Sequence, residues 1–260
     1  MSSEQYLRDF EEKGYCIVEN VLSIDQINAL RATVQDLADF ERSVGRAHLY
    51  GELYRGAEGT MQRVWNLLGK NQLFHPVLLS EPIPQLLGEI FDRPTTHDKY
   101  FLSSFQANIL YPGAPMQNLH IDTPVPEPLP PWIIKANTIW ALDEFTEQNG
   151  ATGLVPGSHR ETHKPRAGQS EIDGEIVACM KPGSVLLTHG ALWHRSRPNA
   201  SEQARIGLLG SFAASFAREI ANEENHTLII DRAMQCQMPP DLQRLIGFSH
   251  GIKLNSTIIR

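Results

Sequence analysis

Asn118-Leu119-His120-Ile121-Asp122 is the stretch on which the interpretation of this sequence depends. Its alternation of apolar and polar residues predicts a strand, and side chains two apart on a strand leave the same face. His120 and Asp122 are therefore expected to point together, with Ile121 turned to the opposite layer. Beside a second histidine they would form a face that suits non-haem Fe(II). Because His-x-Asp is common by chance, the pattern alone also fits a polar strand face with a hydrogen-bonded histidine.

The composition is that of an ordinary globular protein, with 260 residues, of which 41% are apolar and 20% charged. The net charge of −7 argues against nucleic acid or an anionic membrane as a partner. No run of about 18 apolar residues is present, and the N-terminus lacks the basic and apolar regions of a secretory signal. Cys16, Cys179 and Cys236 are far apart and odd in number, which indicates reduced thiols. We expect a cytoplasmic protein, for which a homodimer is left open.

The order of the expected elements predicts a fold that is mainly β with a helical cover. Helical spacing occurs at 2–13, 24–40, 73–79, 82–91 and 240–246, and a long loop is expected at 41–60. Strands are expected at 15–18, 63–67, 100–111, 132–142, 152–155, 175–180, 184–189 and 205–216. Many short strands with helices gathered on the N-terminal side favour a double-sheet jelly roll.

We find no linker that would divide the chain, so a single domain of residues 1–260 is predicted. Its helical N-terminal part is expected at about 1–95, the jelly-roll core at about 96–220 and a C-terminal extension at 221–260. Residues 123–131 contain five prolines, too many for a strand ladder, and form either a rim beside the site or a stiff surface loop.

Two histidines could complete the metal face, His189 and His194, which follow a strand and flank a glycine turn. Arg205 stands eleven residues beyond His194 and opens a further strand. Strand parity places Arg205 and Gly207 on one face, and a glycine beside an arginine leaves room for a carboxylate bound in bidentate fashion. A surface ion pair is the alternative for Arg205.

At these residues the sequence resembles the phytanoyl-CoA dioxygenase family of Fe(II)/2-oxoglutarate oxygenases. The motifs that carry the resemblance are His120-x-Asp122, Asn149-Gly-Ala-Thr-Gly-Leu-Val-Pro-Gly-Ser-His159, His194-Arg-Ser196 and Arg205. The resemblance covers most of the chain, and the corner that ends in His159 is its most specific part. It implies the double-stranded β-helix, which agrees with the jelly roll expected above.

The resemblance also implies a set of site residues. Its metal ligands map onto His120, Asp122 and His194, and its 2-oxoglutarate arginine maps onto Arg205. Further contacts with the co-substrate are implied for Ser196, Gln117 and Thr138, and contacts with the substrate for Arg63 and Trp65. Such an enzyme takes Fe(II), 2-oxoglutarate and O2, releases succinate and CO2, and hydroxylates, desaturates or cyclises a small organic molecule, here expected to belong to secondary metabolism.

Two other classes of protein fit parts of the pattern. A zinc-dependent hydrolase or isomerase uses the same ligand types, but it has no need of a hook for a distant carboxylate such as Arg205. A non-catalytic binding protein of the same fold has no need of a complete ligand triad. The carboxylate of Asp122 further separates the chain from the halogenating relatives, which lack it so that chloride can bind.

Overall fold

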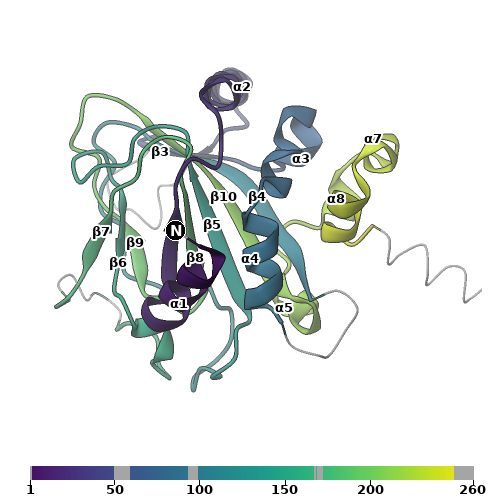
Figure 1. The fold of residues 1–260 in the computed structure, drawn as a ribbon. Helices are drawn as coiled ribbons and strands as arrows, with labels where there is room; N and C mark the ends of the chain where they lie inside the picture. The colour runs from purple at the N-terminus through teal and green to yellow at the C-terminus, as the bar shows by residue number, and fades with distance from the viewer. Residues whose placement is uncertain (1, 50–58, 93–98, 167, 169–171, 249–260) are drawn as a thin grey trace, which may run out of the picture.

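The computed structural model describes residues 2–49, 59–92, 99–166, 168 and 172–248. Two β-sheets face each other, and helices α3, α4 and α8 lie on the outer side of the larger sheet (Figure 1). This arrangement is the jelly roll with helical cover that the strand pattern predicts. No helix within the described ranges is long and apolar enough to cross a membrane.

Strands β1 to β5, β8 and β10 form the larger sheet, and β6, β7 and β9 form the smaller one. Their bounds are β1 Tyr15–Val18, β2 His48–Leu49, β3 Met61–Val64, β4 Tyr100–Leu110, β5 Lys135–Ala141, β6 Thr152–Leu154, β7 Ile176–Ala178, β8 Val185–His189, β9 His194–Ser196 and β10 Arg205–Ala214. The larger sheet has the order β1-β8-β5-β10-β4-β3-β2, and the smaller sheet has the order β7-β6-β9. All of these pairings are antiparallel.

The helices gather before β4 and after β10. Their bounds are α1 Ser3–Lys13, α2 Ile24–Ser43, α3 Leu67–Lys70, α4 Ile83–Ile90, α5 Arg218–Ala221, α6 His226–Ile229, α7 Arg232–Gln237 and α8 Pro240–Leu245. Short 3-10 turns lie at Gln72–Phe74, Val77–Leu79, Ser158–Arg160 and Ser215–Ala217. The first two helices have the expected ends. Gly14, at φ 84°, closes α1, and Ser23 forms a capping box with Gln26 at the start of α2.

Apolar residues pack on both faces of the larger sheet. On the outer face, Trp140 and Phe105 belong to a cluster that also holds Leu30 of α2 and Leu87 of α4. Between the sheets, a smaller cluster around Phe145 closes one end of the sandwich. The inner face of the larger sheet is therefore apolar at that end and free to carry polar side chains elsewhere.

Among the described residues, no strand pairs with one side of the first half of β4. Strand β3 pairs only with residues 107–110 of β4, and the segment 221–224 covers the edge before them. The backbone N–H of Glu224 donates to the carbonyl of Ser103 at 2.7 Å, and the carboxylate of Glu224 accepts the N–H of Phe105 at 2.9 Å. The same carboxylate accepts the N–H of Asn66 at 2.7 Å, so it satisfies two backbone donors, of which that of Phe105 lies on the edge of β4.

Some expectations about the elements are wrong. The strand expected at 63–67 ends at Val64, because Asn66 adopts a left-handed φ of 53° and Leu67 begins α3. The helix expected at 73–79 is two 3-10 turns separated by Pro76. The strand expected at 132–142 begins only at Lys135.

Strand β9 and helices α5 to α7 were not expected. The loop expected at 41–60 contains the end of α2 and β2, and its residues 50–58 lie outside the described residues, as do residues 249–260 of the expected C-terminal extension. The domain boundaries stay a prediction.

Candidate functional site

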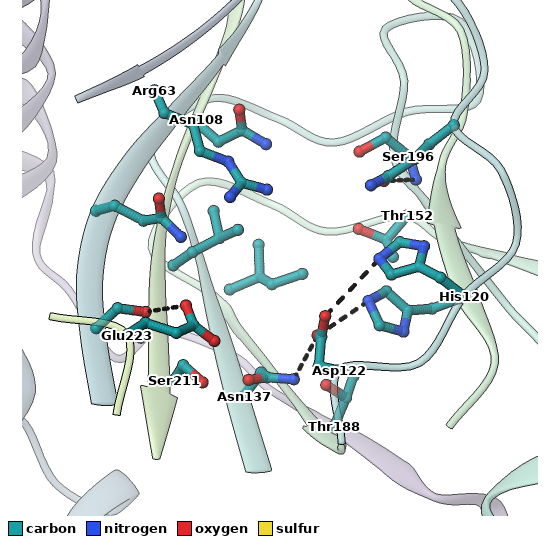
Figure 2. A pocket seen from close by; sticks show the side chains of 17 residues that line it. Arg63, Asn108, His120, Asp122, Asn137, Thr152, Thr188, Ser196, Ser211 and Glu223 are labelled. Atoms are coloured by element: carbon teal, nitrogen blue, oxygen red, sulfur yellow. Dashed lines mark hydrogen bonds and ion pairs between the residues drawn. The ribbon is translucent and has the colours of Figure 1, made fainter. Parts of the chain in front are cut away.

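A cavity of about 270 Å³ lies between the two sheets. Its ligand wall comes from the smaller sheet and the segment before it: Gln117, His120, Asp122, Thr152, His194 and Ser196. Its opposite wall comes from β3, β4 and the segment after α5: Arg63, Ser104, Gln106, Asn108 and Glu223. Its floor comes from β5, β8 and β10: Asn137, Ile139, Thr188, Leu209, Gly210 and Ser211. Figure 2 shows the two walls on either side of the cavity.

The segment 118–122 is not a regular strand, which corrects the expectation from its alternation. It makes one bridge to β9, through His120 and His194, whose backbone groups exchange two hydrogen bonds of 3.0 Å. Farther along, the N–H of Asp122 donates to the carbonyl of Gly190 at 2.8 Å. His120 and Asp122 nevertheless point together, as expected, because the segment stays extended over these residues.

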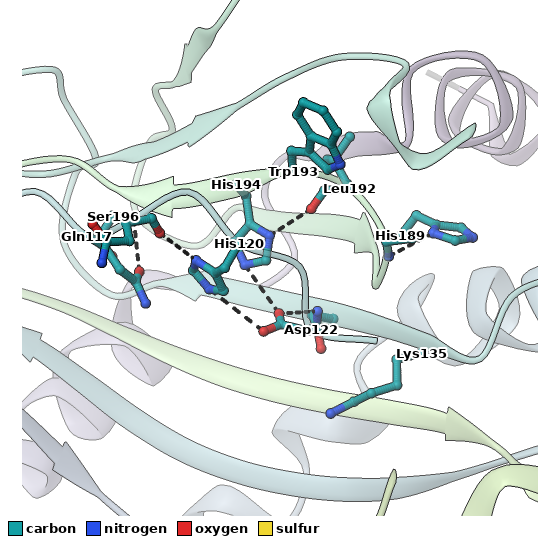
Figure 3. Close-up of polar contacts among 12 residues, drawn as sticks. Gln117, His120, Asp122, Lys135, His189, Leu192, Trp193, His194 and Ser196 are labelled. Carbon is teal, nitrogen blue, oxygen red and sulfur yellow. Dashed lines mark hydrogen bonds and ion pairs between the residues drawn. The ribbon is translucent and has the colours of Figure 1, made fainter. Parts of the chain in front are cut away.

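His120, Asp122 and His194 form a cluster whose metal-binding atoms all lie within 4.8 Å of one another. The Nε2 atom of His194 lies 3.2 Å from Oδ2 of Asp122, and Nε2 of His120 lies 3.8 Å from Oδ1 (Figure 3). Both Nδ1 atoms lie 2.9 Å from a backbone carbonyl two residues earlier in the chain. A neutral imidazole that donates from Nδ1 presents a lone pair at Nε2, which is the form that binds a metal ion.

The electrostatics favour an ionised Asp122 carboxylate and a neutral His120 imidazole. Burial alone would raise the pKa of Asp122. The neighbouring His194 and His120 outweigh this effect, so the pKa lies well below its usual range. Burial and the neighbouring His194 lower the pKa of His120 to about 4. Asn137 on β5 donates from Nδ2 to Oδ2 of Asp122 at 2.8 Å and fixes the orientation of the carboxylate. Three such donors on one face fit a divalent metal.

The short strand β9 is anchored by an ion pair on the face that points away from the cavity. His194 and Ser196 face the cavity, while Arg195 points away and donates from Nε to Glu175 at 2.9 Å. Gly153, opposite Arg195 on β6, leaves the room that Glu175 occupies, because an added Cβ would lie 2.1 Å from Oε1. This buried ion pair holds the strand that carries the second histidine.

The corner at 149–159 has a structural role. Asn149 accepts the N–H of Thr146 at 2.8 Å and closes the turn that leads into β6. Ser158 accepts the N–H of Trp193 at 2.9 Å, so the corner fixes the chain directly before His194. The Nε2 atom of His159 lies 3.1 Å from the carbonyl of Glu11, which ties the corner to α1.

Arg205 is a buried cation at the start of β10, with 4% of its surface exposed. It shares a strand face with Leu209, which lines the cavity. Between them stands Gly207, where an added Cβ would lie 2.9 Å from the ring of Phe145. The guanidinium carbon lies 4.1 Å from the centre of that ring.

The Nε atom of Arg205 is buried and makes no hydrogen bond to any residue that the structure describes. Burial lowers the pKa of Arg205 to about 10, an effect that Asp143 opposes. Asp143 is itself bound by Arg31 at 2.6 Å and by the N–H of Ile206 at 2.8 Å. A buried guanidinium with an unused donor fits a ligand that brings its own carboxylate.

The expected co-substrate contacts divide into two groups. Gln117 and Ser196 are adjacent on the ligand wall, where the N–H of Ser196 donates to Oε1 of Gln117 at 3.1 Å. Thr138 lies on the other face of β5, where its hydroxyl contacts Trp140 and the carbonyl of Gly210. The contact expected for Thr138 therefore conflicts with this geometry, and Thr152, paired with Ser196 in the smaller sheet, lines the cavity instead.

The residues expected at the substrate also divide. Arg63 lines the cavity, whereas Trp65 lies beside it, 5.5 Å from the Arg63 guanidinium carbon to the ring centre. No tryptophan and no residue of 123–131 is among the described residues that line the cavity. His189 points away from the metal cluster, toward Phe10 and His159, so the geometry favours His194 as the second histidine.

Several cavity residues were not predicted from the sequence. Asn137 and Thr152 could have been found from strand parity once β5 and β6 were aligned with the metal-binding segment. Gln106 and Asn108 alternate on β4, but alternation alone does not say which face meets the cavity. Glu223 lies in a stretch with neither helical nor strand periodicity, so only the fold brings it to the site.

Residues 10–207, more than half of the chain, match the family model of phytanoyl-CoA dioxygenase (PhyH). The chain belongs to this family. It is therefore an Fe(II)- and 2-oxoglutarate-dependent dioxygenase, which confirms the family and the cofactors that the motifs predict.

Two fungal proteins of similar sequence are dioxygenases by name. The dioxygenase trt7 of Aspergillus terreus is 27% identical, with 95% of this chain and 85% of that protein covered. The dioxygenase cdmA of Talaromyces verruculosus is 28% identical, with 96% and 85% covered.

Solved structures of low sequence identity share the fold. The non-heme alpha ketoglutarate dependent epimerase SnoN from nogalamycin biosynthesis superimposes with a TM-score of 0.66 at 17% identity, covering 81% of this chain and 80% of that one. HygX from Streptomyces hygroscopicus, solved with nickel and 2-oxoglutarate bound, gives a TM-score of 0.64 at 14% identity, covering 83% and 89%. These likenesses confirm the double-stranded β-helix.

Proposed function

We propose that this dioxygenase oxidises an unactivated C–H bond of a small organic molecule in secondary metabolism. The observation that carries the proposal is the placement of Arg205, a buried cation with an unused donor, on the strand face that leads to the His120, Asp122 and His194 cluster. Fungal dioxygenases of similar sequence and SnoN, a protein of nogalamycin biosynthesis, support the biological setting.

In this proposal His120, Asp122 and His194 hold the iron, and Arg205 binds the far carboxylate of 2-oxoglutarate. Gln117 and Ser196 line the cavity together with the metal cluster, and Thr152 takes the role first expected for Thr138. When bound, the iron and 2-oxoglutarate supply the oxidation: O2 is reduced, 2-oxoglutarate is converted to succinate and CO2, and the substrate is oxidised.

The residues of this chain position these partners and shield them. The two Nδ1–H groups hold the imidazoles in one orientation, and Asn137 does the same for Asp122. The substrate's place is proposed to be the opposite wall, where Arg63 lies, with Trp65 as its support. A zinc hydrolase has no use for the buried Arg205, which weighs against that alternative.

Anaerobic titration of 2-oxoglutarate into the Fe(II) enzyme tests the proposal. The metal-to-ligand charge-transfer absorption should saturate in the wild type and weaken in Arg205→Ala. A panel of metabolites scored for succinate above the uncoupled background then identifies the substrate. Absence of 2-oxoglutarate binding to the wild-type Fe(II) enzyme would contradict the assignment.

A further inference from the structure

Glu223 reaches the cavity from a part of the chain that the family does not assign. It lies beyond residue 207, where the match to the family model ends. Among the described residues that line the cavity, it and Asp122 are the acidic ones. Figure 2 shows Glu223 with Arg63 and Asn108 on the wall opposite His120. A carboxylate in this place faces the substrate's space and not the metal.

Two side chains hold the Glu223 carboxylate in position. Ser104 donates to Oε2 at 2.9 Å, and Lys135 donates to Oε1. The Lys135 side chain is 2% exposed, whereas that of Glu223 is 41% exposed. A buried ammonium needs a close counter-charge, so the Lys135 ammonium holds the Glu223 carboxylate in place. A carboxylate oxygen accepts more than one hydrogen bond, so Glu223 retains acceptor capacity toward the cavity.

The backbone on either side of Glu223 is fixed as well. Its own N–H donates to Ser103 Oγ at 3.0 Å, and Ser103 Oγ donates to the carbonyl of Ala221. Glu224 then binds the open edge of β4 through its backbone and its carboxylate. The two neighbouring glutamates thus have separate tasks: Glu224 attaches the segment, and Glu223 projects from it into the cavity.

The surroundings of Glu223 contain polar groups without partners. The side-chain oxygens of Gln106, Asn108 and Ser211 are buried and make no hydrogen bond within the described part of the chain. A buried polar group without a partner costs free energy, and a cavity wall with several of them is typical of a site that a polar ligand completes. An apolar ligand on this wall would leave those groups unsatisfied.

We propose that Glu223 is a substrate-binding residue that accepts a hydrogen bond from a hydroxyl or amide N–H of the substrate. The substrate then carries at least one polar hydrogen-bond donor and is not a bare hydrocarbon. A neutral donor suffices, because Lys135 already balances the charge of Glu223. This inference rests on the proposed function and specifies the substrate class for the same site.

The test compares three proteins: wild type, Glu223→Gln and Glu219→Gln, the last being a matched change at an exposed residue of α5. Polar probes are the N-acetyl-L-amino acid amides and the common hexoses, and apolar probes are monoterpene hydrocarbons. Succinate above the uncoupled background is measured. We expect stimulation by one or more polar probes and by no monoterpene. Glu223→Gln should lower kcat/KM for an active probe about tenfold, while Glu219→Gln matches the wild type.

A parallel titration separates this inference from the proposed function. Glu223→Gln should bind 2-oxoglutarate in the anaerobic Fe(II) enzyme as the wild type does. If the wild type binds 2-oxoglutarate but no polar probe stimulates it, or monoterpenes do, the substrate class is wrong. If Glu223→Gln leaves kcat/KM unchanged or loses 2-oxoglutarate binding, the role given to Glu223 is wrong.

Ser104→Ala provides a second variant, which keeps the Lys135 pair intact. It removes one hydrogen bond that positions Glu223, so we expect a smaller loss of about threefold in kcat/KM for the same probe. A loss in Ser104→Ala without one in Glu223→Gln would contradict the positioning.

Discussion

The ligand wall and the opposite wall of the cavity differ in how completely their polar groups are satisfied. On the ligand wall, His120, Asp122 and His194 each have a fixed hydrogen-bond partner in the protein. On the opposite wall, the side-chain oxygens of Gln106 and Asn108 have none among the described residues. The first wall is built around groups that stay the same in every turnover, and the second is left open for a molecule that completes it.

The largest effect is expected where the ligand wall loses a metal-binding atom. His194→Ala should reduce succinate formation at least about a thousandfold and leave the fold intact, because the imidazole faces a cavity and does not pack in the core. Iron content after anaerobic loading and succinate release measure this. His189→Gln is the matched control and should retain both, since His189 points away from the cluster. The reverse result would assign the metal to His189.

A smaller effect is expected at the start of β10, the strand whose later residues form part of the floor. Arg205→Ala removes a charge-assisted pair in a desolvated place, which typically costs about 2–5 kcal/mol. The Kd for 2-oxoglutarate in the anaerobic Fe(II) enzyme should therefore rise roughly 30-fold or more. Iron affinity should change little, and Arg205→Lys should rescue poorly because it lacks the planar fork. Equal 2-oxoglutarate affinity of the wild type and Arg205→Ala would mean that another residue binds the far carboxylate.

The floor is expected to contribute to the ligand wall through one hydrogen bond. Asn137→Ala frees the carboxylate of Asp122 and should lower metal affinity about tenfold, the lower end of what an outer partner contributes. Competition with a chelator measures the affinity. Thr188→Ala is the comparison, because Thr188 belongs to the same floor and it is Asn137 that donates to Asp122. Equal losses in both variants would indicate a general loosening of the floor.

The smallest effect concerns a histidine outside both walls. Burial lowers the pKa of His189 to about 3, so it stays neutral in the folded protein while the unfolded chain binds a proton below about pH 6.5. Stability is thus lost as pH falls, by about 1 kcal/mol from His189 between pH 7 and 5.5. Urea unfolding of wild type and His189→Gln at the two pH values measures the difference. A wild-type stability no more pH-dependent than that of the variant would contradict the neutral state.

The metal face could be predicted because it depends on short spacings. Two residues apart in an extended segment point the same way whether or not a ladder forms, so His120 and Asp122 converge although the predicted strand is a single bridge. Arg205 was placed by parity with Gly207 in the same manner. The choice between His189 and His194 needed the resemblance, since both flank the same turn.

The remaining positions depend on which face of a strand is turned inward. Thr138 and Asn137 are neighbours on β5, but only Asn137 lines the cavity, whereas Thr138 contacts Trp140 on the opposite face. Glu223 is a stronger case, because a chain of tertiary contacts with β4 places it there. No periodicity near residue 223 carries that information.

The half-edge of β4 that the segment 221–224 covers has a consequence for the protein's tendency to aggregate. The N–H of Phe105 and the carbonyl of Ser103 are bound by Glu224 and by no strand. Unpaired strand edges attract the edges of other molecules and start aggregation. The segment that carries Glu224 therefore prevents a strand of another molecule from pairing with this edge of β4. Truncation of the chain before residue 221, or proteolysis within this segment, is expected to produce a protein that self-associates through the edge of β4.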